Sequence, residues 1–378
     1  MKSVVPKQDR DLSGRPVSGL PGASVPALVE ALLDQAVDRG ASDIHLDPQA
    51  DGYEVRFRVD GLLETVGSLA PATGRAVVTR LMVMAGLLTY RLDIPQEGRL
   101  AARCASVERV LAMRVSVIPT THGQRAVLRL PAELHQPRTL KDLDLPRPAL
   151  EGLEAFAAAD AGMLLVVGPA GSGKTTTIYA LLEHLLQAQP GTSVVALEDP
   201  VERDLPGVTQ VEVSAHGELD YARALRSILR QDPQVLMLGE IRDARTASIA
   251  IEAALSGHRL IATMHAGGPE TAIARLLEMQ IAAYQVAGAL HGVLSARLLR
   301  RRNPSGDGYR GRIPVAEFAR IDDAARAAII EHQSAPALRQ ILLAGSSYLT
   351  IAGAARQWQE AGLTDEAEIR RVLGEPSL

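Results

Sequence analysis

The sequence predicts an α/β protein, in which a domain with a parallel sheet is preceded by a smaller α+β domain and followed by a helical C-terminal part. Four apolar segments alternate with helical patterns, as buried parallel strands do. These segments span residues 162–168, 192–199, 234–240 and 259–265. Upstream of them, short strand-like segments are separated by turn residues. After about Thr271 the spacing of apolar residues is almost entirely helical.

The first domain is predicted from the order of its elements. Residues 1–24 are polar, with Pro and Gly interspersed, and we expect them to be a flexible tail. Val25–Gly40 has apolar residues at helical spacing and ends at a glycine, as a capped helix does. Strand-like segments follow at 43–48, 53–67, 98–104, 108–120 and 124–130, with a helical pattern at 74–88. We therefore expect an α+β domain over residues 25–132.

A linker separates this domain from the second one. Residues 133–149 are rich in proline and in charged residues. After them, apolar strands alternate with helical patterns. The second domain, residues 150–378, is expected to hold the parallel sheet and, at its end, a helical subdomain.

The composition narrows the classes of protein to which the chain can belong. With 378 residues, 47% of them apolar, the chain is long enough for about two or three domains. Its single cysteine, Cys104, excludes an internal disulfide and indicates a reducing, cytoplasmic compartment. No apolar run approaches the roughly 18 residues of a membrane span, so we expect any membrane role to depend on partners. A net charge of −4 and 3% aromatic residues argue against nucleic-acid binding.

The segment "GPAGSGKT" fits the phosphate-loop pattern and lies between an apolar strand and a helical run, as that pattern requires. Glycines let backbone N–H groups surround the phosphates, Lys174 bridges the outer phosphates, and the Thr175 hydroxyl can bind Mg²⁺. The residues expected to bind the nucleotide are Gly168, Gly171, Ser172, Gly173, Lys174, Thr175 and Thr176.

Acidic residues follow two further apolar strands. "LEDPVE" carries Glu198, Asp199 and Glu202, and the next strand ends at Glu240. Because such strands point their carboxyl ends at the ligand, we expect Glu198 and Glu240 to organise water and metal, with Glu240 as a Mg²⁺ ligand. The alternative is that these are solvated surface carboxylates, but several strand ends around one phosphate loop favour function. Glycine precedes Glu240, where an aspartate is common in other nucleotidases.

Two histidines flank the fourth apolar strand. His258 precedes the strand and is best interpreted as structural, because nothing nearby demands a proton carrier. His265 ends the strand, where it could sense the terminal phosphate. No two histidines have the spacing of a zinc site with acidic residues nearby, so no transition metal is expected.

A family resemblance rests on motifs spread over residues 41–372. They are "ASDIHLDP" and "VRFRVDG" in the first domain, then the phosphate loop, "LEDPVE", "ILRQDPQVLMLGEIRD" and "SGHRLIATMH" in the second. Downstream, "GYRGRIPVAEF" and "GLTDEAEIRRVL" look like the closing segments of the same family. Together, in this order, they resemble the secretion ATPases of the type II secretion and type IV pilus superfamily, the GspE and PilB type most closely.

The resemblance implies a RecA-like ATPase domain behind a PAS-like domain, with ATP and Mg²⁺ as ligands and no zinc. Such relatives are hexameric motors for pseudopilus or pilus assembly, in which the α+β domain of one subunit sits over the nucleotide of the next. By this analogy, Arg99 and Arg114 match arginines that reach the terminal phosphate in trans, and Arg56 and Arg58 are lesser candidates. Expected partners are an inner-membrane platform or docking protein, which would hold a cytoplasmic protein at the membrane.

Other functions remain open, and three features depart from the family pattern. A pilus-retraction motor would use the same site. A DNA-transfer pump is an alternative that the net charge of −4 disfavours. A nucleotide-binding switch without rapid turnover is an alternative that the intact lysine and acidic residues disfavour. "SARLLRRRNPSGDGYRGR" contains no cysteine where many relatives have a tetracysteine zinc segment. The larger N-terminal docking domain is expected to be missing, and "MHAGGPETA" lacks the polar run that commonly follows the second histidine.

Overall fold

The computed structural model describes residues 10–11, 24–131, 139–213, 219–304, 308–345 and 348–374. The chain divides into two compact units, residues 1–135 and 136–378, each with its own sheet. Most of the expected tail and the first residues of the expected linker, 133–138, lie outside the described residues. Within the described part of the chain, no helix is both long enough and apolar enough to cross a membrane.

The first unit is a seven-stranded antiparallel sheet with two α-helices. Its elements are β1 (Arg10–Asp11), α1 (Val25–Asp38), β2 (Ala41–Gln49), β3 (Gly52–Val59), β4 (Leu62–Leu69), α2 (Pro71–Met84), β5 (Gln96–Cys104), β6 (Arg109–Thr120) and β7 (Gly123–Arg129). The strand order is β1-β4-β3-β2-β7-β6-β5, so β2 and β7 pair in the middle of the sheet. The α+β class expected for this region is confirmed.

Alternation along β2 gives this sheet one apolar and one charged face. Ile44 and Leu46 belong to the apolar core, together with residues of α1 and α2. Their neighbours Asp43, His45 and Asp47 point to the opposite face, because successive side chains of a strand alternate. All three are nevertheless buried, at 4%, 6% and 6% exposure. Buried charges of this kind need partners.

Arginines from the strands on either side of β2 supply those partners. Arg56 of β3 and Arg125 of β7 donate to Asp47 over 2.6 and 2.5 Å, and Arg129 of β7 donates to Asp43 over 3.0 Å. Burial alone would raise the pKa of Asp47, but the hydrogen bonds from Arg125 and Arg56 outweigh it and lower the pKa. The motifs "ASDIHLDP" and "VRFRVDG" therefore stabilise each other across the strands.

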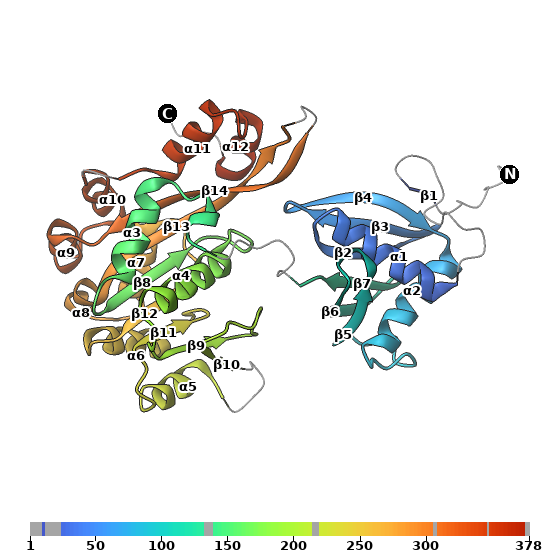
Figure 1. Cartoon of the computed structure of the whole chain (residues 1–378), viewed down its shortest axis with the longest axis horizontal. Coiled ribbons are helices and arrows are strands. Elements are labelled where there is room, and N and C mark those ends of the chain that lie inside the picture. The colour runs from blue at the N-terminus through green and yellow to red at the C-terminus, as the bar shows by residue number, and fades with distance from the viewer. Residues whose placement is uncertain are drawn as a thin grey trace. The chain divides into compact units, whose positions relative to one another are not determined.

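The second unit is built on a seven-stranded mixed sheet (Figure 1). Its elements are α3 (Arg147–Ala157), β8 (Gly162–Val167), α4 (Lys174–Ala188), β9 (Val194–Glu198), β10 (Val208–Glu212), α5 (Tyr221–Ile228), β11 (Val235–Leu238), α6 (Ala244–Leu255), β12 (Arg259–Met264), α7 (Pro269–Glu278), α8 (Ala283–Ala289), β13 (Leu290–Arg302), β14 (Tyr309–Arg320), α9 (Asp323–Ile330), α10 (Ala335–Leu343), α11 (Ile351–Glu360) and α12 (Glu366–Leu373). The strand order is β10-β9-β11-β12-β8-β13-β14, and only the β13–β14 pair is antiparallel. The predicted parallel sheet is confirmed.

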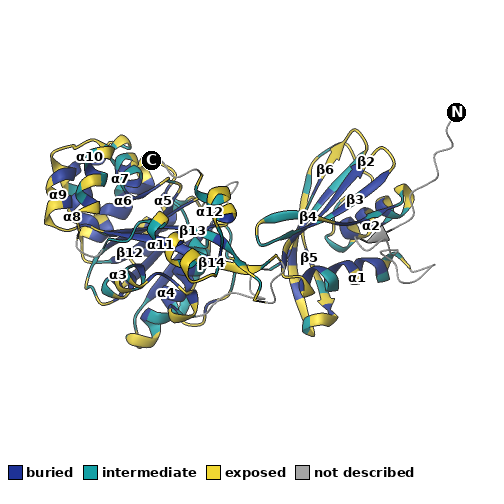
Figure 2. Ribbon diagram, turned by 90° about the horizontal axis from the view of Figure 1, so that it is seen from above, coloured by how far each residue is buried: buried dark blue, intermediate teal, exposed yellow. Residues whose placement is uncertain are grey.

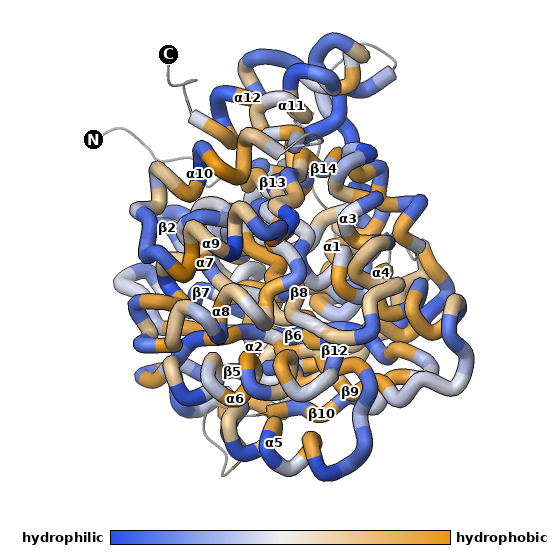
Figure 3. Tube along the Cα trace, turned by 90° about the vertical axis from the view of Figure 1, so that its left-hand side faces the viewer, coloured by the Kyte–Doolittle hydropathy of each residue, from blue (hydrophilic) through white to orange (hydrophobic). Residues whose placement is uncertain are grey.

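Helices cover both faces of this sheet, which explains its continuous apolar strands. On β8, Met163, Leu165 and Val167 belong to the core shared with α5–α10. Leu164 and Val166 belong to the core on the other face, shared with α3 and α4. The central strands are accordingly buried in Figure 2 and largely hydrophobic in Figure 3. Both alternating sets of side chains are buried, so these strands do not alternate in polarity.

The expectation that the chain is almost entirely helical after Thr271 is wrong, because β13 and β14 form a long hairpin in that region. β13 lies between β8 and β14 and is buried on both faces along most of its length. Its apolar residues Val293, Leu294 and Leu298 follow Leu290 by three, four and eight residues. This spacing imitates the pattern of a helix. The helices α9–α12 that follow are confirmed.

Candidate nucleotide site

The strand order gathers the predicted functional residues at one edge of the second sheet. β8 leads into the loop 168–173, the neighbouring β12 leads into His265, and the next strand, β11, leads toward Glu240. On the other side of β8, β13 brings Arg297 to the same edge, two residues beyond the pairing of Ser295 with Val167. Ligands bind at the carboxyl ends of parallel strands, so this edge is the candidate site.

The loop 168–173 has the conformation of a phosphate cradle. Its glycines have positive φ angles of 148° at Gly168, 73° at Gly171 and 89° at Gly173. A Cβ atom at Gly168 would lie 2.6 Å from both the carbonyl oxygen of Ala296 and the hydroxyl of Ser172, so a side chain there would displace the loop. Ser172 Oγ is buried and has no partner among the described residues. A buried hydroxyl of this kind fits a loop that binds a polar ligand.

The start of α4 offers the donors that a phosphate group needs. No side chain caps this helix, so its first N–H groups and its dipole are available to an anion. The Lys174 ammonium donates to the carbonyl oxygens of Gly168 and Pro169, over 3.0 and 2.9 Å. Burial lowers the pKa of Lys174, and nearby Glu240 only partly opposes that shift. A phosphate fits this site because it would compensate a partly buried charge.

Thr175 has an acidic neighbour that the sequence analysis named without giving it a role. The Thr175 hydroxyl donates to Glu202 Oε1 over 3.3 Å. Glu202 follows β9 in the "LEDPVE" segment. A hydroxyl next to a carboxylate is the kind of oxygen donor set that suits Mg²⁺. Thr176 lies in the same first turn of α4.

Glu198, at the end of β9, lies in a buried hydrogen-bond network beside α4. Its side chain accepts hydrogen bonds from the hydroxyl of Tyr179 and from Nε2 of Gln210, the latter over 2.9 Å. Burial raises the pKa of Glu198, and the two hydrogen bonds offset that shift only in part. The Tyr179 oxygen also accepts from the backbone N–H of Glu202 over 3.4 Å. The Glu198 carboxylate thus holds the segment that carries Glu202.

Glu240 and His265 lie side by side. Glu240 Oε1 is 3.3 Å from His265 Nε2, and Oε2 accepts from Arg242 Nε over 2.6 Å. The His265 side chain is half exposed, and its backbone oxygen accepts from Arg275. Glu240 and His265 follow two different strands, and the adjacency of β11 and β12 explains why they meet. The pair can hold a water molecule and exchange a proton with it.

Gly239 is closely packed at the end of β11. A Cβ atom there would lie 2.7 Å from the Tyr221 hydroxyl and 3.1 Å from the carbonyl oxygen of Leu197. The backbone N–H of Gly239 donates to that same carbonyl over 2.7 Å, and its own carbonyl accepts from Thr263. The strand end is therefore fixed by backbone contacts, and an aspartate would not fit without rearrangement.

His258 has structural contacts at the start of β12, at the opposite end of the strand from His265. Its Nδ1 atom lies 3.0 Å from the carbonyl oxygen of Ala253, and its own carbonyl accepts from the backbone N–H of Gly162 over 3.1 Å. These contacts join α6 and β8 to β12. The geometry agrees with the structural interpretation of this residue.

Arg297 is a site residue that the sequence analysis missed. It donates to the carbonyl oxygens of Ala296 and Gly267 over 2.8 and 2.9 Å, which ties β13 to the loop after His265. Its charge lies close enough to Lys174 to contribute to lowering the pKa of that lysine. Burial likewise lowers the pKa of Arg297. No motif marked this arginine, because a helix was expected where β13 lies.

The arginines expected to act in trans lie in the first unit. Arg99 of β5 and Arg114 of β6 are exposed, and they lie directly opposite each other in the β5–β6 ladder. Arg114 is in turn opposite Arg129 of β7, so three arginines form one row across the sheet. Arg56 pairs with Asp47, and Arg58 is 3.5 Å from an oxygen of Asp43. The two lesser candidates therefore have partners within their own sheet.

Known proteins resemble the chain over most of its length. The type II secretion system protein HxcR of Pseudomonas aeruginosa is 38% identical over 93% of this chain and 78% of its own. The type IV pilus assembly ATPase PilB of Thermus thermophilus is 34% identical over 83% of this chain and 39% of its own. Among solved structures, the pilus retraction motor PilT with bound ADP matches with a TM-score of 0.65 and 25% identity, over 92% of this chain and 97% of that one.

The motifs, the sheet order and these similarities agree. The family described as type II/IV secretion system protein matches residues 21–371, which include both units' described sheets except β1. This chain belongs to the type II/IV secretion system protein family.

Proposed function

We propose that the chain is a Mg²⁺-dependent ATPase that serves as a motor for type II secretion or type IV pilus assembly. The observation that carries the proposal is the convergence of the phosphate loop, Glu240 and His265 at the ends of neighbouring strands. The structure of PilT with bound ADP supports nucleotide binding. The names of HxcR and PilB support secretion or pilus assembly as the process that the motor serves.

Each residue of the site has a proposed task. ATP is held by Gly168, Gly171, Ser172, Gly173, Lys174, Thr175 and Thr176. Mg²⁺, which neutralises charge on the phosphates when bound, would be held by Thr175 and Glu240, with Glu202 within reach. Glu240 accepts a proton from the attacking water as the water oxygen bonds to the terminal phosphorus, while the bond from that phosphorus to the bridging oxygen breaks and ADP leaves; His265 senses the released phosphate. For Glu198, which the sequence led us to expect as an organiser of water and metal, we propose instead the role of a positioning residue that acts through Tyr179.

Hydrolysis would be completed in trans within a ring of subunits, with a hexamer as the expected state. Arg99 and Arg114 supply positive charge to the terminal phosphate of a neighbouring subunit, and two exposed arginines opposite each other in a ladder suit an anionic ligand. Such a motor works at the cytoplasmic face of the inner membrane, on a platform or docking protein of the secretion machinery. No zinc and no nucleic acid are needed for this activity.

Pilus retraction is the second candidate function. It is favoured by the likeness to the retraction motor PilT, whose structure covers 92% of this chain. The same nucleotide site would serve pilus assembly or pilus retraction. The two functions differ in which pilus or pseudopilus process fails when the chain is removed.

ATP turnover by the purified chain tests the proposed activity. We expect turnover that requires Mg²⁺, is abolished by Lys174→Ala, and falls about 10²- to 10⁴-fold in Glu240→Gln, because the variant cannot accept a proton. Glu278→Gln, exposed at the end of α7, is the matched control and should keep the activity of the unmodified chain. Equal turnover in Glu240→Gln and Glu278→Gln would remove Glu240 from the mechanism.

A further inference from the structure

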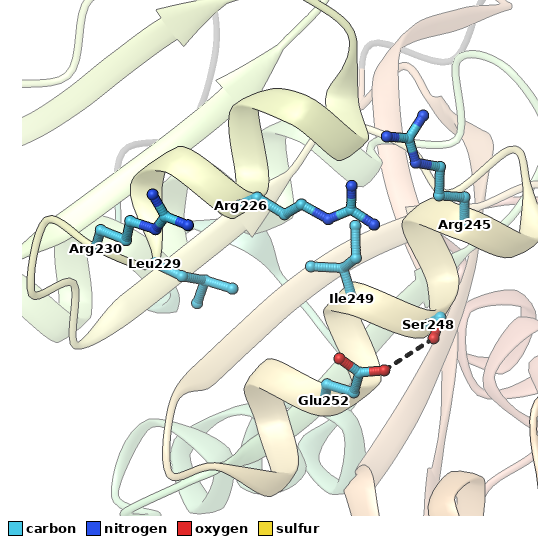
Figure 4. A pocket seen from close by; sticks show the side chains of 7 residues that line it. All are labelled: Arg226, Leu229, Arg230, Arg245, Ser248, Ile249 and Glu252. Atoms are coloured by element: carbon cyan, nitrogen blue, oxygen red, sulfur yellow. Dashed lines mark hydrogen bonds between the residues drawn. The ribbon is translucent and has the colours of Figure 1, made fainter.

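A basic pocket lies between α5 and α6, outside the nucleotide site. Its volume is about 430 Å³, and the guanidinium groups of Arg226, Arg230 and Arg245 line it. Figure 4 shows Arg226 and Arg230 on one helix and its extension, and Arg245 on the helix facing them. All three residues are exposed.

No acidic side chain among the described residues pairs with these three arginines. Within the described residues, none of the three forms an ion pair or side-chain hydrogen bond, whereas Arg300 and Arg339 both bond to buried carboxylates. The one carboxylate lining the pocket, Glu252, accepts a hydrogen bond from Ser248 over 3.1 Å. The pocket is therefore a site of net positive charge.

The position of Arg245 is unfavourable for the fold alone. It lies in the first turn of α6, where the positive end of the helix dipole repels a cation. Arg226 is different, because it lies in the last turn of α5, where a cation is stabilised by the dipole. Three like charges and one adverse dipole at a single pocket suit an anionic partner.

The floor of the pocket distinguishes between classes of anion. Leu229 and Ile249 line it between the arginines, and Ile249 is buried in the core of the unit. A phosphate group would use the guanidinium groups and leave the apolar floor uncovered. A peptide that alternates acidic and apolar side chains would use both kinds of surface, since arginine pairs with carboxylates in a bidentate geometry.

We propose that this pocket is the docking site for an acidic segment of a partner protein. Carboxylates of the segment pair with Arg226, Arg230 and Arg245, and an apolar side chain of the segment lies against Leu229 and Ile249. The docking does not depend on nucleotide hydrolysis, because none of these residues has a role in the proposed catalytic site.

The test measures binding of a fluorescein-labelled synthetic peptide of alternating glutamate and leucine to the full chain, by fluorescence anisotropy. We expect saturable binding that weakens as salt is raised, and much weaker binding of the same peptide with glutamine in place of glutamate. Arg226→Gln and Arg245→Gln should each weaken binding about tenfold, the loss of one charged contact. Arg223→Gln, on the same helix but outside the pocket, should leave binding unchanged, and thermal unfolding checks that every variant is folded.

Several results would overturn the proposal. Equal binding of the glutamine peptide, or unchanged binding in both pocket variants, would show that the arginines do not select carboxylates. Displacement of the peptide by equimolar inorganic phosphate or by phosphatidylglycerol vesicles would identify a general anion or lipid site instead. Self-association of the chain that the pocket variants abolish, without peptide binding, would assign the pocket to a second copy of the chain.

Discussion

At the scale of single residues, the packing around Gly239 shows how the end of β11 positions Glu240. The glycine occupies a space bounded by the Tyr221 hydroxyl and the Leu197 carbonyl, and it bonds through its backbone to β9 and β12. The sequence reveals that an aspartate is missing here, but not why, because Tyr221 and Leu197 are distant along the chain. The backbone contacts of Gly239 therefore fix the strand end from which the Glu240 side chain reaches Arg242 and His265.

Gly239→Ala should lower both stability and turnover. The added Cβ would lie within 2.7 Å of the Tyr221 hydroxyl, and relieving such a contact costs about 1–3 kcal/mol of unfolding free energy. Urea denaturation and ATP turnover measure the two effects. Tyr221→Phe in the same chain removes the clashing oxygen and should recover part of the loss, with Tyr221→Phe alone as the control. A double variant no better than Gly239→Ala would show that the Leu197 carbonyl is the real obstacle.

Arg297 should contribute to nucleotide binding through its charge and its bond to the loop after His265. Arg297→Gln removes a positive charge beside Lys174, so the pKa of Lys174 should rise, while the affinity for ATP falls about tenfold. Arg297→Lys keeps the charge but loses the two guanidinium hydrogen bonds to the carbonyl oxygens of Ala296 and Gly267, so its affinity for ATP should be intermediate. Calorimetric titration with ATP checks the order of the three chains. Equal affinities would make Arg297 a purely structural link between β13 and that loop.

At the scale of elements, the β13–β14 hairpin is the main feature that the sequence did not predict. Their non-alternating apolar residues looked helical, so the position of Arg297 next to β8 could not be foreseen. The same hairpin anchors the last helices. Leu299, Ile313 and Val315 form a small core with α11, and Glu368 of α12 bonds to the backbone N–H and side chain of Arg300 over 2.8 and 2.9 Å.

Glu368→Gln should detach α12 from the hairpin. Glu368 is fully buried, and removing its charge leaves Arg300 and Arg371 without their carboxylate, which costs about 3 kcal/mol. The only tryptophan, Trp358, packs against the same cluster, so urea denaturation followed by its fluorescence reports the change. Glu366→Gln is the matched control, because its exposed pair with Arg370 contributes only about 0.2–0.5 kcal/mol.

The pH dependence of this helix follows from the same carboxylate. Burial alone would raise the pKa of Glu368, but hydrogen bonds from Arg371 and Arg300 outweigh it and lower the pKa from 4.5 to about 2. A lowered pKa in the folded state means that the contribution to stability is complete above pH 4.5 and is lost as the pH falls toward 2. Glu368→Gln should lose that part of the acid sensitivity. A variant with unchanged sensitivity would assign it to other carboxylates.

At the scale of the whole molecule, what the sequence predicted and what it did not have a common physical basis. The parallel sheet, the phosphate loop and the strand-end positions of Glu240 and His265 follow from contiguous segments, each with its own local signal. The contact between Thr175 and Glu202, the burial of Glu198 and the place of Arg297 depend on packing between segments far apart in the chain. Such packing has no local signature.

Two inactive variants test the proposal that ATP hydrolysis is completed by a neighbouring subunit. Arg99→Ala lacks the proposed arginine in trans, and Lys174→Ala lacks the phosphate-binding lysine, so each alone should be inactive. Arg103→Ala, exposed on the same strand as Arg99, should stay active and is the control. In an equimolar mixture, some interfaces combine an intact Arg99 from one chain with an intact Lys174 from the other.

ATP turnover of that equimolar mixture, compared with each variant alone, is the most direct measurement. If Arg99 acts in trans, mixing the two inactive variants restores part of the activity, and the restored activity falls on dilution as rings dissociate. A mixture as inactive as its components, while Arg103→Ala and the unmodified chain hydrolyse ATP at any dilution, would contradict it. Each subunit would then complete its own site, and Arg99 would act within its own chain.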